Sequence, residues 1–254
     1  MALFTDGPCV SVNDLAQQES GLLDVARTAG INVTAKITLA HDELAADLQL
    51  WLDRWRGFAE EIWRPYLRLD QVVATPQIKR WETLQALALF YRDAYFTQLT
   101  DRYQPKWDEY ARLTRVAYDR FVSAGMGIVN DPVRQAAPPV LGSATGPQKG
   151  GSYYASIGWL NAAGQEGAAS TPASITFPDG NLMTVSASAP PSNAVGFNVY
   201  AGASLDALYR QNAAPLPPNG IFTYVPGAVI SGPLPGAGQH PDFIRPLVRT
   251  IPRG

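Results

Sequence analysis

The 254-residue chain has one cysteine and two histidines. A lone thiol excludes an intrachain disulfide, and Cys9, His41 and His240 show none of the spacings by which cysteines and histidines hold zinc. A nucleophilic catalytic pair would have to recruit one of the two histidines, which lie far apart in the sequence. We expect His41 on the surface at the start of a helix, beside Asp42 and Glu43. The sequence therefore predicts no metal, no cofactor and no catalytic residue.

Long apolar runs and a surplus of positive charge are missing as well. No stretch of about 18 apolar residues runs without charge, so we expect no transmembrane helix and no membrane partner. Residues 1–7 lack the basic segment and the apolar run of a signal peptide. With a net charge of −2, the chain is not expected to be a dedicated nucleic-acid binder, which would carry a basic face.

Paired carboxylates are present, and such pairs serve as the acid and base of glycosidases. The two pairs are Glu60-Glu61 and Asp108-Glu109. Both fall on the polar faces of predicted helices, where charged side chains normally contact water. We therefore predict that the chain is not an enzyme.

The composition of the chain changes near residue 131. Residues 1–137 hold 15 of the 20 basic and 18 of the 22 acidic side chains, which leaves five and four for the remainder. The second part is instead rich in Gly, Ala, Ser and Pro. One core does not usually draw on two such compositions, so two domains are expected. The predicted parts are a helical assembly domain at 1–130, a Pro/Gly-rich linker at 131–145, a β domain at 146–230 and an extended C-terminal arm at 231–254.

Apolar residues in the first part recur with the period of an α-helix. The clearest stripe is Leu44, Leu48, Trp51, Trp55, Phe58, Ile62 and Tyr66, and Pro65 is expected to end or kink this helix. Further helices are predicted from Thr75-Pro76 to about Leu99, from Pro105 to Ala124-Gly125, and from Asn13 or Asp14 to Ala29. The pattern between Gly30 and Ala40 does not decide between a loop and an extended segment. Four helices with short connections predict a bundle-like domain.

Five of the six tryptophans lie in this helical part. Trp51, Trp55, Trp81 and Trp107 fall on apolar stripes and are predicted in the core. Trp63 lies beside the main stripe, so we expect it to pack under another helix or against a partner subunit.

From Gly150 the period changes from 3.6 to two. Tyr153, Ala155, Ile157 and Trp159 alternate with small or polar residues. Further alternating runs lie around 173–177, 182–187, 195–199 and 221–225, separated by Gly and Pro turns. Short strands at this spacing predict a β-sandwich, so the fold class expected for the whole chain is multidomain, α then β.

Part of the β region resembles fibronectin type III modules. The string Gly151–Glu166 (GSYYASIGWLNAAGQE) with Ser170 is similar to a late strand and turn of that family, and Leu182–Val185, Pro190-Pro191 and Gly196–Gly202 (GFNVYAG) are similar to the stretch that follows. The likeness covers about 60 residues and implies an Ig/fibronectin III-like sandwich, a scaffold or binding surface rather than a catalyst. The tryptophan that the family has after this Leu-x-x-Val strand is replaced by Ala187 or Ser188. We expect Trp159 to fill the core instead.

The C-terminal arm combines five prolines with apolar and basic side chains. The prolines exclude a regular helix or a central strand. A frayed terminus fits this composition, and so does an arm that becomes ordered when it docks on a neighbouring subunit. The predicted partner-binding residues of the arm are Phe243, Arg245, Leu247, Arg249 and Arg253.

A helical domain, a fibronectin-like module and an apolar, Arg-bearing arm together resemble the head-to-tail connector (adaptor or neck) proteins of tailed bacteriophages. The resemblance rests on helix number, helix length and the arm. It implies a homo-oligomeric ring, a dodecamer in that family, which binds the portal protein and the tail or nozzle protein and extends the DNA channel. DNA would pass without sequence-specific binding. It also implies a virion protein of the neck, made in the cytoplasm of the bacterial host.

The alternative is a tail-fibre or surface protein whose β domain recognises glycan. Aromatic side chains stack on sugar rings, and the residues available for this are Tyr153, Tyr154, Tyr200, Tyr209 and Tyr224.

Overall fold

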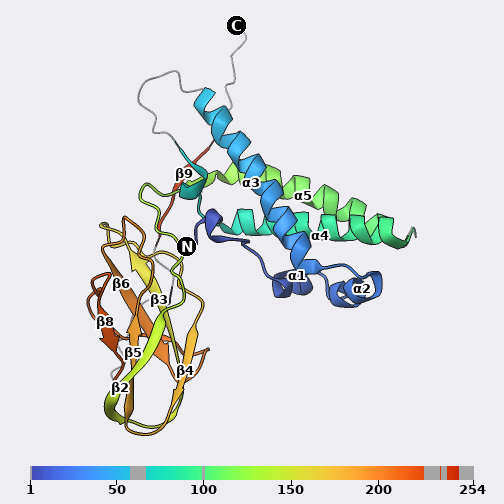
Figure 1. Cartoon of the computed structure of the whole chain (residues 1–254). Coiled ribbons are helices and arrows are strands. Elements are labelled where there is room, and N and C mark those ends of the chain that lie inside the picture. The colour runs from blue at the N-terminus through green and yellow to red at the C-terminus, as the bar shows by residue number, and fades with distance from the viewer. Residues whose placement is uncertain (1, 58–66, 99–100, 226–234, 236–238, 246–254) are drawn as a thin grey trace. The chain divides into compact units, whose positions relative to one another are not determined.

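The structure, a computed structural model, describes the whole chain except residues 1, 58–66, 99–100, 226–234, 236–238 and 246–254 (Figure 1). It is mixed, with an N-terminal helical part followed by an antiparallel β region. Two compact units divide the chain. The β unit comprises Met1–Asp6 and Val129–His240, and the helical unit comprises Gly7–Ile128 and Pro241–Gly254. The N-terminal segment thus belongs to the β unit and the C-terminal segment to the helical unit, although each is distant in sequence from the rest of its unit.

The helical unit contains five α-helices among its described residues. They are α1 (Val12–Gln18), α2 (Leu22–Ala29), α3 (Val33–Gly57), α4 (Pro76–Gln98) and α5 (Gln104–Ala124), and the short 3-10 helix η2 spans Leu69–Gln71. Helix α4 has more buried residues than any other helix described in the unit, and α3 and α5 both pack on it. Trp81 of α4 lies 5.5 Å from Phe121 and 5.1 Å from Tyr118 of α5, measured between ring centroids. Aromatic packing of this kind holds α4 against α5.

The helix ends follow the predicted chemistry in α4 and α5. Pro76 opens α4, and the Thr75 hydroxyl accepts a hydrogen bond from the Ile78 backbone N–H at 3.4 Å. Gly125 follows α5 with φ +94°, and Gly30 follows α2 with φ +68°. Both values lie in the region that favours glycine.

Two helix predictions are wrong. The single helix expected before Ala29 is broken at Glu19 into α1 and α2, and the undecided segment between Gly30 and Ala40 is mostly the first part of α3. The Asn32 side chain accepts the Ala35 backbone N–H at 3.1 Å, and buried residues at the helical spacing continue the stripe backwards from Leu44. His41, Asp42 and Glu43 consequently lie inside α3 and not in its first turn.

The core role of Trp81 is confirmed, whereas Trp51 and Trp107 are partly exposed. The Trp55 side chain lies outside the described residues. So do the structures of Phe58, Ile62, Trp63, Pro65 and Tyr66.

Among its described residues, the β unit contains two antiparallel sheets, in the orders β2-β5-β8 and β4-β3-β6-β7. The strands are β2 (Val140–Gln148), β3 (Gly151–Leu160), β4 (Ala173–Phe177), β5 (Asn181–Ser186), β6 (Gly196–Gly202), β7 (Tyr209–Arg210) and β8 (Ile221–Thr223). Residues 140–145, expected in the linker, form the first part of β2. They pair with β5 from Val140↔Ser186 onward.

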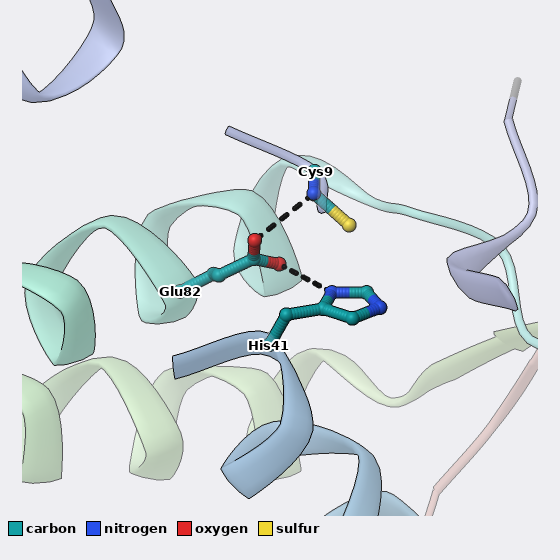
Figure 2. A group of neighbouring side chains, drawn as sticks. All are labelled: Cys9, His41 and Glu82. Atoms are coloured by element: carbon teal, nitrogen blue, oxygen red, sulfur yellow. Dashed lines mark hydrogen bonds and ion pairs between the residues drawn. The ribbon is translucent and has the colours of Figure 1, made fainter. Parts of the chain in front are cut away.

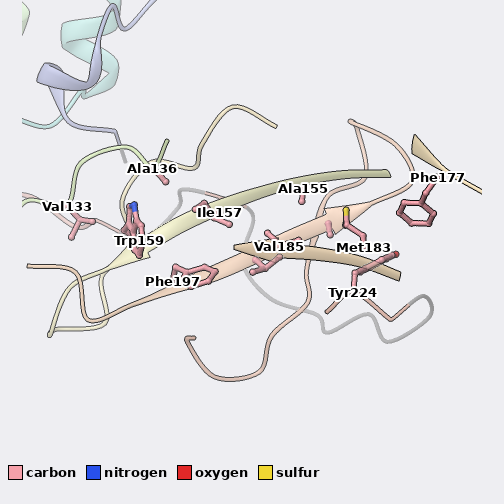
Figure 3. Packing of buried hydrophobic residues seen from close by; sticks show 12 residues of the cluster. Val133, Ala136, Ala155, Ile157, Trp159, Phe177, Met183, Val185, Phe197 and Tyr224 are labelled. Carbon is pink, nitrogen blue, oxygen red and sulfur yellow. The ribbon is translucent and has the colours of Figure 1, made fainter. Parts of the chain in front are cut away.

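One hydrophobic cluster draws on strands of both sheets (Figure 3). Trp159 of β3 lies 5.6 Å from Phe197 of β6 between ring centroids, and Met183 and Val185 of β5 are fully buried beside them in the same cluster. Trp159 is 1% exposed, so its predicted place in the core is confirmed. Within the described part of the chain, no helix is long and apolar enough to cross a membrane.

Candidate functional site

The C-terminal arm joins the helical unit at Pro241. Its strand β9 (Asp242–Ile244) pairs antiparallel with β1 (Met126–Ile128), with Met126 opposite Ile244 and Ile128 opposite Asp242. The Val73 backbone N–H donates to the Gly127 carbonyl at 3.0 Å, which fastens β1 to the segment before α4. The arm is therefore held by strand β9 beside β1, directly after the end of α5.

Two of the five predicted arm residues lie at this point. Phe243 is 51% exposed. The Arg245 guanidinium donates through Nε to the Ala124 carbonyl at 2.9 Å, at the C-terminal end of α5 where carbonyls lack helical partners and attract a cation. Leu247, Arg249 and Arg253 lie outside the described residues.

Two glycines allow the arm to approach β1 closely. A Cβ on Gly125 would meet Arg245 Cγ at 2.7 Å and the Ile244 carbonyl oxygen at 2.8 Å. A Cβ on Gly127 would meet Pro241 Cβ at 3.1 Å. The Gly-x-Gly spacing after α5 is the sequence signal for this contact, because it removes the side chains just before β1 and at the middle of β1.

A groove lies on the surface of the helical unit between α3, α4 and α5. It has a volume of about 500 Å³, and its lining includes Trp51, Trp81 and Tyr118 together with four charged residues, Asp47, Arg54, Arg115 and Asp119. A second hollow of about 230 Å³ shares Gln85, Thr114 and Arg115 with the first and extends along α4 and α5 to Trp107. The groove lining includes aromatic side chains and both signs of charge, so it suits a peptide with apolar and charged side chains.

Cys9, His41 and Glu82 converge from three separate segments of the helical unit (Figure 2). The Glu82 side chain is completely buried; one carboxylate oxygen accepts the Cys9 backbone N–H at 3.0 Å, and the other lies 3.3 Å from His41 Nδ1. The Cys9 sulfur, one ring nitrogen of His41 and a Glu82 oxygen lie within 4.8 Å of one another. Thiol, imidazole and carboxylate are the three side-chain types that hold zinc.

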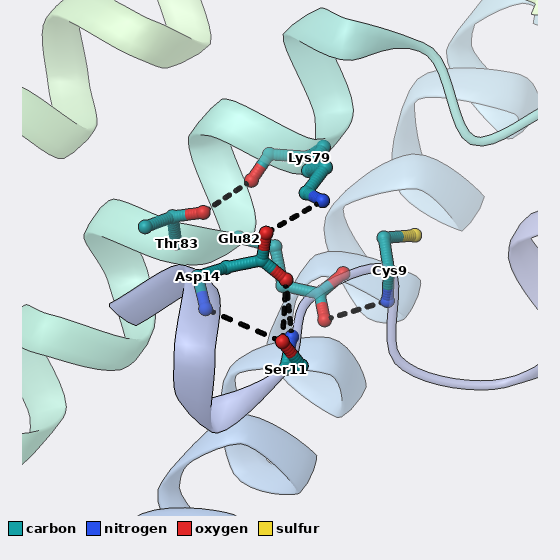
Figure 4. Close-up of polar contacts among 6 residues, drawn as sticks. All are labelled: Cys9, Ser11, Asp14, Lys79, Glu82 and Thr83. Carbon is teal, nitrogen blue, oxygen red and sulfur yellow. Dashed lines mark hydrogen bonds and ion pairs between the residues drawn. The ribbon is translucent and has the colours of Figure 1, made fainter. Parts of the chain in front are cut away.

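The segment that carries Cys9 is fixed to α4 by a second polar cluster (Figure 4). Ser11 and Asp14 form a capping box at the start of α1, and Lys79 of α4 pairs with Asp14 at 2.8 Å. The hydrogen bond from Lys79, followed by those from Ser11, lowers the pKa of Asp14 to about 2. Lys79 lies almost one turn before Glu82 but is directed to Asp14, and the ionisable side chain in contact with the Glu82 carboxylate is the His41 ring.

Sequence reasoning missed this cluster. Its members are separated by 32 and 41 residues, so no motif spacing connects them. His41 was expected on the surface, but its side chain is only 13% exposed because α3 begins at Val33 and this residue faces α4. The sequence does contain one sign of the cluster, which is a charged residue on an apolar helix face. Glu82 lies four residues after Ile78 and four before Ala86 on the buried face of α4. His240 lies elsewhere and is exposed.

The β unit holds a different buried carboxylate. Glu166 accepts hydrogen bonds from the Tyr200 hydroxyl at 2.8 and 2.9 Å and from Asn198 Nδ2 at 3.1 Å. Burial raises the pKa of Glu166, and burial followed by the nearby carboxylate raises that of Tyr200. These groups are paired with one another inside the unit.

The tyrosines considered for glycan binding differ in exposure. Tyr200 and Tyr224 are buried, Tyr153 and Tyr154 are partly buried, and Tyr209 is 52% exposed. Tyr153 also stacks on Phe177 with ring centroids 5.2 Å apart. Of these five side chains, Tyr209 has the largest free surface for a sugar.

No protein-family model matches the chain, and neither does any curated protein or solved structure.

Proposed function

We propose that the chain is a head-to-tail adaptor of a tailed bacteriophage. Copies of it form a ring between portal and tail, extend the DNA channel and let DNA pass without sequence-specific binding. In this proposal the helical unit is an assembly domain of the four-helix-bundle type. The β unit is an Ig/fibronectin III-like sandwich that decorates the ring, and the virion neck is its location.

The anchored arm is the observation that carries the proposal. Strand β9 joins the arm to the helical unit through β1, and Arg245 binds the end of α5. Nine more residues follow Arg245 in the sequence, and at about 3.3 Å per extended residue they reach at most about 30 Å. An apolar, basic segment of that reach, starting from a fixed point, is suited to clasping a neighbour.

We propose the groove between α3, α4 and α5 as the place where a neighbouring copy receives this arm. Asp47 and Asp119 on the lining are complementary to Arg249 and Arg253 of the arm. The aromatic side chains of the groove offer apolar surface to Leu247 and the apolar residues beside it.

Charge reversal tests this pairing. In the full-length chain, Arg249→Glu with Arg253→Glu should lower the fraction of oligomers measured by mass photometry at low ionic strength, because the arm then repels the aspartates. Asp47→Arg with Asp119→Arg should do the same. All four substitutions together should restore assembly at least partly, since the attraction is re-formed with its signs exchanged.

The matched control is Asp108→Arg with Glu109→Arg. It makes the same charge change at exposed positions of α5 that do not line the groove, so its oligomers should equal those of the unaltered chain. If the fourfold variant stays dissociated while its circular dichroism is unchanged, the arm does not bind this groove.

A further inference from the structure

We propose that Cys9, His41 and Glu82 bind a divalent transition-metal ion of the zinc type, which fastens the N-terminal segment to α3 and α4. The inference is independent of the proposed role in a phage neck. It rests on the ligand set, on the spacing of the ligand atoms and on the charge that Glu82 requires.

The ligand set suits zinc. Zinc binds cysteine sulfur, histidine nitrogen and carboxylate oxygen, usually with four ligands; this cluster supplies one of each, and the fourth ligand would be water. Oxygen-preferring ions such as magnesium or calcium would not select a thiol and an imidazole.

The spacing is close to that of a coordinated ion. A tetrahedral zinc with bonds of about 2.0–2.1 Å to nitrogen and oxygen places those two atoms about 3.3–3.4 Å apart. His41 Nδ1 and the Glu82 oxygen are 3.3 Å apart. The sulfur lies within 4.8 Å of both ligand groups, so a small movement of the Cys9 side chain completes three bonds.

Charge is the third argument. A nearby positive charge stabilises a fully buried, ionised carboxylate, and Lys79 on the same helix is directed to Asp14. A divalent ion with one thiolate and one carboxylate has zero net charge, and a neutral His41 leaves that balance unchanged. Binding transfers the Cys9 thiol proton to solvent. Cys9 and His41 are partly exposed, which gives the ion a path to the site.

The test uses the full chain without a polyhistidine tag, incubated with zinc chloride and then dialysed against metal-free buffer. Elemental analysis should find about one zinc per chain. Cobalt chloride in place of zinc should give the near-ultraviolet absorption of a cobalt–thiolate bond. Zinc in excess should raise the Tm by roughly 5 °C over the chain in chelator, because it binds the folded state.

Three variants locate the ion. Cys9→Ser and His41→Gln should each lower retained zinc at least tenfold and remove the Tm difference, and Cys9→Ser should also remove the cobalt–thiolate absorption. His240→Gln, at an exposed histidine outside the cluster, should retain zinc and the Tm difference in full. The cobalt spectrum of the unaltered chain needs no variant, so misfolding of a variant cannot hide the answer.

Two results would overturn the proposal. One is an unaltered chain that retains no zinc and gives no cobalt–thiolate absorption. The other is equal zinc retention by the unaltered chain and by Cys9→Ser.

Discussion

Inside the β unit, the Glu166 side chain fills the space that a side chain at Gly158 would need. A Cβ on Gly158 would lie 2.0 Å from a Glu166 carboxylate oxygen, and that carboxylate accepts hydrogen bonds from Tyr200 and Asn198. Asn198 is also the residue opposite Gly158 in the ladder between β3 and β6. The missing side chain at 158 thus makes room for a paired, buried carboxylate.

Gly158→Ala should therefore lower the free energy of unfolding by about 2–3 kcal/mol, as overpacking and a disturbed buried network both cost stability. Urea unfolding of the β unit measures this. In a Glu166→Ala background the same substitution should cost much less, because the clashing group is gone. Equal costs in the two backgrounds would show that Glu166 does not fill the space above Gly158.

Asp14 predicts a pH dependence in the helical unit. Its pKa is about 2 in the folded chain against 3.8 ordinarily, so the unfolded chain binds the proton more readily. The stability that Asp14 contributes is full above about pH 4 and is lost as the pH falls towards 2. Because the side chain is 27% exposed, we expect only about 1 kcal/mol.

The measurement compares unfolding of the unaltered chain and of Asp14→Asn between pH 5 and pH 2. The unaltered chain should be more stable by about 1 kcal/mol at pH 5, and the difference should shrink to near zero at pH 2. A difference that stays constant over this interval would mean that the carboxylate charge of Asp14 adds no stability.

At the scale of elements, the error at α1 and α2 has a tertiary cause. Local propensity continues a single helix through residues 13–29, but the Glu19 carboxylate accepts hydrogen bonds from Lys106 at 2.7 Å and Tyr110 at 2.8 Å. Burial alone would raise the pKa of Glu19, but these two bonds, together with the charge of Lys106 and the Gly21 backbone N–H, lower that pKa. A contact with α5, nearly 90 residues away, thus accompanies the break between α1 and α2, and no local pattern contains it.

Other helices and strands could be predicted because their local sequence signals agree with the structure. The start of α4 needs only Thr75-Pro76, the end of α5 needs only Gly125, and alternation around Trp159 gives β3. The prolines of the arm excluded a helix, as found in its described part, but a three-residue strand between Pro241 and Pro246 depends on a partner 116 residues away in the chain. Register between distant segments is a tertiary property and leaves little trace in sequence.

The close approach of β9 to β1 yields a prediction at Gly125. Gly125→Ala should accelerate hydrogen exchange at residues 242–244 by about tenfold or more, because its Cβ would overlap Arg245 and the Ile244 carbonyl. Gly30→Ala is the matched control, since Gly30 also follows a helix with positive φ but faces open space. It should lower helix stability by about 1 kcal/mol and leave exchange at 242–244 unchanged. Equal protection of 242–244 in both variants would contradict the packing at Gly125.

At the scale of the whole molecule, composition predicted two units but not their terminal segments. The sharp fall in charge after residue 137 separates helical from β sequence. Residues 1–6 nevertheless belong to the β unit, where Asp6 accepts the Gln135 backbone N–H at 2.9 Å, and the part of the arm from Pro241 onward belongs to the helical unit. Short terminal segments carry too few residues for their composition to show which of the two units they belong to.

Of the two candidate sites, the arm could be predicted from the sequence and the cluster of Cys9, His41 and Glu82 could not. The arm was visible in the sequence because apolar residues and regularly spaced arginines are unusual among prolines. The Cys9, His41 and Glu82 cluster was invisible because it depends on where α3 begins and on how α3 and the N-terminal segment pack on α4. A candidate site formed by neighbouring residues of the sequence could be predicted, whereas a site that helix packing brings together could not.

The most direct test of the adaptor proposal is native mass spectrometry of the full-length chain mixed with the portal protein of the same phage. The account predicts a complex that contains one portal ring and a ring of this chain, twelve copies if it follows the connector family. Removal of residues 246–254 should abolish the complex while both units stay folded. A chain that remains monomeric at every concentration and never joins the portal would contradict the account.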